Sequence, residues 1–108
     1  MVKVTILKHE GIIRGFHIGG HAGCGTAGKD IICAAVSSAA YLVANTITEV
    51  MGIDADTQVD QALMRLTLTK EQAIKAQDLL KGFELQMREL NKAHSKNIKV
   101  IYGGVLNA

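Results

Sequence analysis

The residues best suited to do chemistry are His21 and Cys33, which stand at either end of a glycine-rich stretch that leads into a helix. We expect Asp30 to be the N-cap of that helix, because its carboxylate can accept a bond from a backbone N–H that has no intrahelical partner. Cys33 is then the third helical residue, in the turn where the helix dipole places about half a positive charge. Such a position favours the thiolate, since a free cysteine pKa of about 8.5 can fall to about 3.5–7.5 there. Cys33 is therefore a candidate nucleophile.

His21 is the candidate base. It lies in the loop Gly19 to Lys29, which contains five glycines, and we expect this loop to be mobile until a ligand orders it. Folded back over the helix end, the loop would bring imidazole to thiol in a Cys/His arrangement. The alternative reading of Cys33 is a small buried hydrophobe, as most free cysteines are. The residue types alone leave both readings open.

Two other motifs in this stretch have weaker cases. Gly23 to Lys29 fits the phosphate-binding pattern G-x-x-x-x-G-K, but Asp30 follows where the motif needs Ser or Thr, and its carboxylate would repel a phosphate. A zinc site would draw on four residues, His17, His21, Cys24 and Cys33, whose spacing differs from that of structural zinc motifs. We therefore expect no cofactor and no metal.

The elements that must position these residues form a pattern of strands and helices. Alternation over Val2 to Leu7 and Ile13 to Ile18 predicts an antiparallel hairpin. Its second strand should carry Ile13, Gly15 and His17 on one face and Arg14, Phe16 and Ile18 on the other. His17 then either points to the site or is a polar rim residue, and strand histidines favour the rim.

Two long helices are expected. The first runs from Asp30 to about Met51, with an apolar stripe and Gly52 after its end; the stripe residues are Ile32, Val36, Ala39, Val43, Ile47 and Val50. Ser37, Ala40 and Ala44 line up with Cys33, which leaves room for a substrate strand. The second starts at Thr69 with a capping box to Gln72; its stripe is Ala73, Ala76, Leu80, Phe83, Met87 and Leu90.

Two further strands between Ile53 and Leu68, with a hairpin through Asp60-Gln61, and a last strand from Lys96 to Tyr102 complete the order β-β-α-β-β-α-β. This predicts an α+β fold with an antiparallel or mixed sheet and two long helices on one face. The 108 residues, 48% of them hydrophobic, suit a single domain over residues 1–108.

Composition limits the cellular setting. The formal net charge is only +2 and the lysines are scattered, so no nucleic-acid-binding surface is predicted. We find no signal sequence and no apolar run approaching twenty residues, and therefore expect a cytoplasmic protein with no membrane contact. Two cysteines in such a protein are expected to be reduced. A reversible disulfide between Cys24 and Cys33 that switches off the site is a further hypothesis.

The motif residues resemble a known family. Gly20-His21-Ala22-Gly23 and the run Gly28-Lys29-Asp30-Ile31-Ile32-Cys33-Ala34-Ala35-Val36-Ser37 are similar to the signature of the ribosomal-processing cysteine proteases called Prp. The likeness extends over the whole chain in length and element order. It implies a cytosolic endopeptidase, typically a homodimer, that removes an N-terminal extension from the large-subunit ribosomal protein numbered twenty-seven. It also implies that His21 and Cys33 form the catalytic dyad.

The resemblance leaves supporting roles open. Asp30 is either the N-cap, which we favour, or a group that orients His21, and Gly20 and Ser37 are candidate supporting residues, although Ser37 suits helix packing better. The family commonly has an aromatic residue after G-H-A-G, where this chain has Cys24. An oxyanion would be stabilised by free N–H groups at the helix start, including that of Cys33. The alternative function is a ribosome-associated binding module without catalysis.

Overall fold

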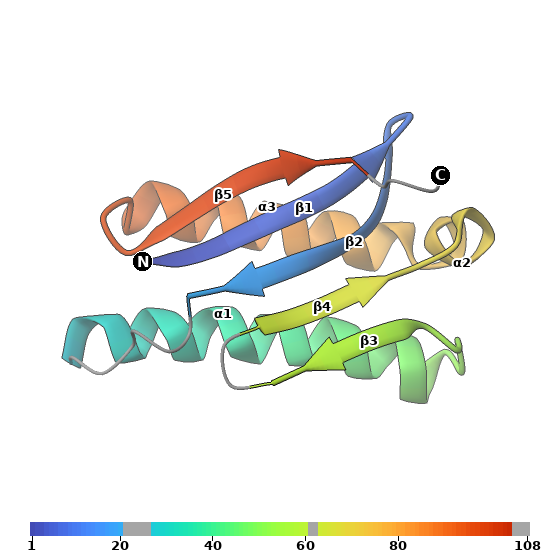
Figure 1. Cartoon of the computed structure of the whole chain (residues 1–108), viewed down its shortest axis with the longest axis horizontal. Coiled ribbons are helices and arrows are strands. Elements are labelled where there is room, and N and C mark those ends of the chain that lie inside the picture. Colours follow the sequence, from blue (N-terminus) through green and yellow to red (C-terminus); the bar gives the residue numbers. More distant parts are fainter. Residues whose placement is uncertain (21–26, 61–62, 105–108) are drawn as a thin grey trace.

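The computed structural model describes residues 1–20, 27–60 and 63–104, which form one mixed five-stranded sheet with its helices on one face (Figure 1). The strands lie in the order β3 (Asp56–Val59), β4 (Leu63–Thr67), β2 (Ile12–Gly19), β1 (Val2–His9) and β5 (Ile98–Gly103). Neighbouring strands are antiparallel except β1 and β5, which are parallel. The predicted α+β class is confirmed.

The β1–β2 hairpin is confirmed, but its face assignment is wrong at one end. Leu7 is opposite Gly15 while Lys8 is opposite Ile13, so a β-bulge leaves Arg14 out of the register. Ile13 therefore joins the core on the helix side with Phe16, 1% and 0% exposed. The prediction from strict alternation placed Ile13 and Phe16 on opposite faces, because it did not allow for the extra residue that the bulge inserts at Arg14.

Gly15 explains where the bulge falls. Its φ of +152° is one that side chains rarely adopt, and a Cβ there would lie 2.0 Å from the carbonyl oxygen of Leu66 on β4. No other residue fits between β2 and β4 at this point. A glycine inside a strand pattern is a signal for a bulge or close backbone approach, and here it marks both.

The predicted β3–β4 hairpin is also confirmed. Asp60 closes it twice, since its Oδ1 accepts a bond from the Leu63 backbone N–H and its own N–H donates to the Leu63 carbonyl, both at 2.9 Å. Gln61, predicted at the turn, lies outside the described residues. The last strand is β5, which begins at Ile98 rather than Lys96 and adds to β1 at the sheet edge.

The first helix, α1 (Ala27–Asn45), begins earlier than the sequence predicted. Asp30 is its fourth residue and not its N-cap, and Cys33 is its seventh residue and not its third. Acidic residues are favoured throughout the first turn of a helix, because the helix dipole is positive there. An aspartate there is thus compatible with a helix that starts three residues upstream.

A π-helical segment, η2 (Thr46–Val50), follows α1 directly. Its bond from the Met51 N–H to the Thr46 carbonyl spans five residues, so each turn holds more residues than an α-helix. The predicted stripe therefore ends at Ile47, which is fully buried, whereas Val50 is 81% exposed. Gly52 has a φ of +68°, as predicted for the residue that ends this helix.

The expectation that no segment approaches twenty apolar residues is wrong. Residues Ile31–Val50 form a helix that is long and apolar enough, by length and composition, to cross a membrane. Its mean hydropathy is high because it contains many alanines beside its large apolar side chains and no lysine or arginine. One face of this helix packs on the sheet through Ile32, Val36 and Ile47. We interpret the segment as the core helix of a folded domain.

The second predicted helix is divided into α2 (Lys70–Lys75) and α3 (Gln77–Ala93). Its capping box is confirmed, since the Thr69 hydroxyl accepts from the Gln72 N–H and the Gln72 side chain accepts from the Thr69 N–H. At the break, the Gln77 side-chain amide donates to the carbonyls of Ile13 and Ala73, and its oxygen accepts from the Ile13 N–H. Gln77 thereby fixes the helix junction to the bulge in β2.

The core lies between the sheet and the helices. Figure 1 shows α1 and α3 side by side behind the strands, with α2 at the end of β4. Phe16 of β2 stacks on Phe83 of α3 with ring centroids 4.4 Å apart. The predicted stripe of the second helical region is buried at Ala73, Ala76, Leu80, Phe83 and Met87, with Leu90 partly buried against it.

Candidate active site

The described part of the candidate active site lies at the end of β2 and in α1. Gly20, which directly follows β2, has a φ of +83°, and a Cβ there would lie 2.3 Å from the carbonyl oxygen of Met1. Glycine is therefore required to let the chain leave β2 beside the start of β1. The next residue in the sequence is His21, and Gly20 stays a candidate supporting residue that would act through the path of the backbone.

Cys33 is held on the inner side of α1. Its side chain is 9% exposed and belongs to the same buried cluster as Val2 and Ile18, which lie at the end of the sheet nearest Gly20. The position of α1 against the sheet thus holds Cys33 firmly, while little of it is open to solvent. A substrate must approach from the helix start or displace a neighbouring segment.

The small-residue strip next to Cys33 faces the core. Ala40 is fully buried and Ala44 is 6% exposed, and Ser37 is half-buried. The expectation that a substrate strand could approach along this strip is wrong, because the strip is the surface on which α1 packs against the sheet. Small side chains here allow close packing.

Cys33 is disulfide-bonded in the structure. This differs from the expectation of two reduced cysteines. The chain's other cysteine, Cys24, lies outside the described residues, as does His21. A sulfur in a disulfide cannot attack a carbonyl, so Cys33 could act as a nucleophile only after reduction.

The helix start determines which backbone groups face the site. The N–H groups that lack intrahelical acceptors include those of residues 27–29, and that of Cys33 is not among them. The dipole acts chiefly within the first turn, so its effect on Cys33 in the second turn is smaller than the sequence predicted. If this thiol is a nucleophile, its activation must therefore come more from a neighbouring base. The Asp30 side chain lies outside the described part of the chain, and its role toward His21 stays a prediction.

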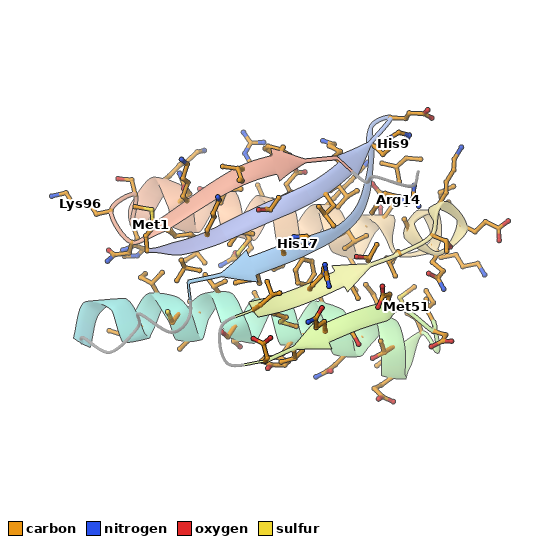
Figure 2. The ribbon with its side chains drawn as sticks, in the orientation of Figure 1. Met1, His9, Arg14, His17, Met51 and Lys96 are labelled. Carbon is orange, nitrogen blue, oxygen red and sulfur yellow. The ribbon has the colours of Figure 1, made fainter. Side chains whose placement is uncertain are left out.

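His17 does not belong to this site. In register it lies between Thr5 and Arg65, on the face of the sheet opposite to the buried Phe16 and Ile18. Figure 2 labels it near the middle of the sheet. Partial burial lowers the pKa of its imidazole, and the nearby Arg65 charge lowers it further. His17 is thus the polar residue on the sheet surface that the sequence favoured.

Within the part of the chain that the structure describes, no group of three or more His, Cys, Asp or Glu side chains could hold a metal ion. The zinc reading included His21 and Cys24, which fall outside that part.

The comparison with protein families decides the identity of the chain. A family model described as cysteine protease Prp matches residues 1–99, a span that contains the glycine-rich stretch and all of α1. The chain belongs to the cysteine protease Prp family. The resemblance noted from the motif residues is thereby confirmed.

Solved structures agree with the Prp fold. The protein SMU.848 from Streptococcus mutans is 26% identical, with a TM-score of 0.87 over 97% of this chain and 96% of that one. The ribosomal processing protease Prp from S. aureus has been solved with a substrate peptide, at 23% identity and a TM-score of 0.84, and with a covalently linked product peptide, at 24% and 0.81. Each of the two covers 95% of this chain and 100% of the other. Comparison with the curated proteins finds no match.

Arg14 is the functional candidate that sequence reasoning missed. It is the one buried charged side chain in the described residues, 8% exposed, and its Nε donates to the Leu68 carbonyl at 2.9 Å. The strand pattern gave a signal, since Ile12-Ile13 breaks the alternation and Gly15 sits inside the strand. Read together, these two features indicate a bulge that turns Arg14 to the open face.

Proposed function

We propose that this chain is a cysteine endopeptidase that removes the N-terminal extension of the large-subunit ribosomal protein numbered twenty-seven and so supports ribosome assembly. The observation that carries the proposal is the Prp family match over residues 1–99, which includes the His21 and Cys33 motifs. The S. aureus Prp structures, one with a substrate peptide and one with a covalently linked product peptide, support a peptide as substrate and a covalent step.

In the proposed mechanism His21 takes the proton from Cys33, and the thiolate attacks the scissile carbonyl carbon. His21 then protonates the leaving amine as the tetrahedral intermediate collapses to a thioester. Water, activated by His21, hydrolyses the thioester and releases the thiol. Because Cys33 lies beyond the first turn of α1, His21 has to supply much of the thiol activation.

The negative oxygen of the tetrahedral intermediate needs backbone donors. The N–H groups of residues 27–29 are among those that α1 leaves without intrahelical acceptors, and they replace the Cys33 N–H as our candidates. The loss of one such donor typically costs about 2.7–4 kcal/mol of barrier. We keep Asp30 as a candidate orienting group for His21. If its charge has no such role, Asp30→Asn should cleave at a near-normal rate.

A homodimer in the cytoplasm is part of the proposal. The outward face of α1 supports it, because Ile31 and Leu42 are 69% and 65% exposed and the helix carries no charge from residue 31 to its end. Exposed apolar surface of this kind is typical of a protein–protein interface. We expect light scattering to give the mass of a dimer, and Leu42→Glu to shift it toward the monomer.

The low exposure of Cys33 favours one alternative, a ribosome-associated binding module in which this cysteine is structural. Intact-mass analysis of the extended ribosomal protein distinguishes the two functions. Under reducing conditions we expect one cut with the wild type and with Cys24→Ala, and none with Cys33→Ala or His21→Ala. Binding of the intact protein without a cut in any variant would favour the binding module.

A further inference from the structure

A cavity of ≈ 520 Å³ opens on the face of the sheet that carries no helix, and Arg14 lines it. The other charged or titratable side chains around it are His17, Asp54, Asp56 and Arg65. Gly20 follows Arg14 by six residues, which is about 20 Å along β2. Cys33 lies on the other side of the sheet, so this cavity is distinct from the candidate active site.

The guanidinium of Arg14 is only partly satisfied. Its Nε donates to the Leu68 carbonyl, and this is the only hydrogen bond or ion pair that the Arg14 side chain makes with described residues. A guanidinium has five N–H donors, so four on the terminal nitrogens are left without a partner in the part of the chain that the structure describes. Burying a charge whose donors are unused raises the free energy of the folded state unless an acceptor or a water molecule accepts hydrogen bonds from it. The cavity is where such an acceptor would bind.

Charged groups around the cavity do not neutralise one another. Asp54 and Asp56 are exposed carboxylates at its rim, and neither forms an ion pair with an arginine within the described residues. Arg65 donates instead to the Gln58 side-chain oxygen. Positive and negative groups are thus both present and both available to a ligand that carries both charges.

We propose that this cavity binds a small molecule with a carboxylate and an ammonium group, as in an α-amino acid. The two terminal nitrogens of Arg14 present parallel N–H donors that match a carboxylate in a bidentate pair. Asp54 and Asp56 accept from the ammonium group and repel a phosphate dianion. The cavity has the size of a small-molecule site, and Leu7 adds an apolar surface beside the charges.

The probes are L-leucine, 4-methylpentanoate, 3-methylbutylamine and inorganic phosphate at constant ionic strength. The second lacks only the ammonium group of leucine and the third lacks only its carboxylate. Titration followed by the NMR signals of the Arg14 side chain and of β2 and β4 backbone amides should show leucine binding best. We expect 4-methylpentanoate to bind more weakly and the amine and phosphate to give no saturable shift. Phosphate bound as tightly as leucine would overturn the proposed ligand class.

Variants locate the site. Hydrogen bonds to a charged group account for about a tenfold to hundredfold loss in affinity when removed, which we expect of Arg14→Gln. Arg14→Lys keeps the charge but lacks the paired N–H donors, and it should also lower the affinity for leucine. Lys81→Gln, an exposed charge on α3, is the matched control and should bind as the wild type does.

Arg14→Gln also loses the bond to Leu68, so a second pair of variants keeps the proposal testable if it fails to fold. Asp54→Asn and Asp56→Asn change exposed side chains and should leave the fold intact. Together they should reduce the ratio by which the protein binds leucine more tightly than 4-methylpentanoate. An unchanged ratio, or leucine shifts confined to residues away from the cavity, would show that the ammonium group is not recognised there.

Discussion

The two helical regions behind the sheet differ in what holds them in place. The α2–α3 region begins with a capping box and has charged residues along its outer face, such as Glu84 and Arg88. Helix α1 has no charged residue after Asp30, and the π-helical segment that follows it carries one, Glu49. The first region is fixed by strong local signals, and the second mainly by its packing against the sheet.

This difference separates stability from chemistry. The candidate nucleophile Cys33 lies in the region that packing positions, whereas the well-capped region carries no candidate catalytic residue. We therefore expect changes in α2 and α3 to alter the free energy of unfolding and to leave the cleavage rate of the folded protein unchanged. Changes at Cys33 should abolish cleavage and have less effect on the free energy of unfolding.

The largest expected effect is the dependence of cleavage on reduction, because Cys33 is disulfide-bonded in the structure. Without a reductant we expect no cleavage by the wild type. Dithiothreitol, whose two thiols are oxidised as the protein disulfide is reduced, should restore it. The measurement is the initial cleavage rate by intact mass across a series of dithiol concentrations.

Cys24→Ala is the matched variant for this experiment. With its only other cysteine removed, the chain cannot form an internal disulfide, so cleavage should proceed without a reductant. The same dithiol dependence in Cys24→Ala and the wild type would show that an internal disulfide does not control the site.

The next effect is on stability. Phe83 is 3% exposed and stacks on Phe16, so Phe83→Ala should lower the free energy of unfolding by about 3–5 kcal/mol. Leu85→Ala, on the exposed side of α3, should change it by about 0.5 kcal/mol or less. Urea unfolding measures both. A Phe83→Ala protein that remains folded but cleaves far more slowly would contradict the separation of the two regions.

The sequence predicted the α2–α3 region well, since a capping box and a regular apolar stripe are local signals. The two hairpins and the order of elements along the chain were predicted on similar grounds. The start of α1 was predicted wrongly because aspartate stabilises both an N-cap and the rest of the first turn. Its preference as a cap, about 1 kcal/mol, is small enough for a longer helix to outweigh it.

The faces of β2 could not be predicted from alternation because the contact that matters lies on another strand. Gly15 is needed where β2 meets the Leu66 carbonyl of β4, and only the assembled sheet shows this approach. The bulge then moves Ile13 into the core and Arg14 out of it. The motif around His21 and Cys33 was recognised by residue type, but the disulfide and the burial of Cys33 depend on three-dimensional packing.

A smaller effect tests the capping box itself. Thr69→Ala removes the hydroxyl that accepts from the Gln72 N–H, and should lower the free energy of unfolding by about 1 kcal/mol with no change in the cleavage rate. Thr69→Ser keeps a cap and should stay close to the wild type. Thermal unfolding of the three proteins measures the difference, and equal losses for Ala and Ser would assign the effect to the threonine methyl group.

The smallest effect is the pH dependence from His17, which lies outside both helical regions. Because burial and the Arg65 charge lower its pKa in the folded state, the unfolded chain takes up the proton first as the pH falls below about 6.5. The folded state therefore loses stability through this window, and the loss is complete below the folded pKa. His17→Gln should remove that part of the acid dependence, whereas His94→Gln, at an exposed histidine, should retain it. Urea unfolding between pH 7.5 and 5 measures the slope, and parallel slopes for His17→Gln and the wild type would mean that the sheet surface accepts a charged imidazole as readily as water does.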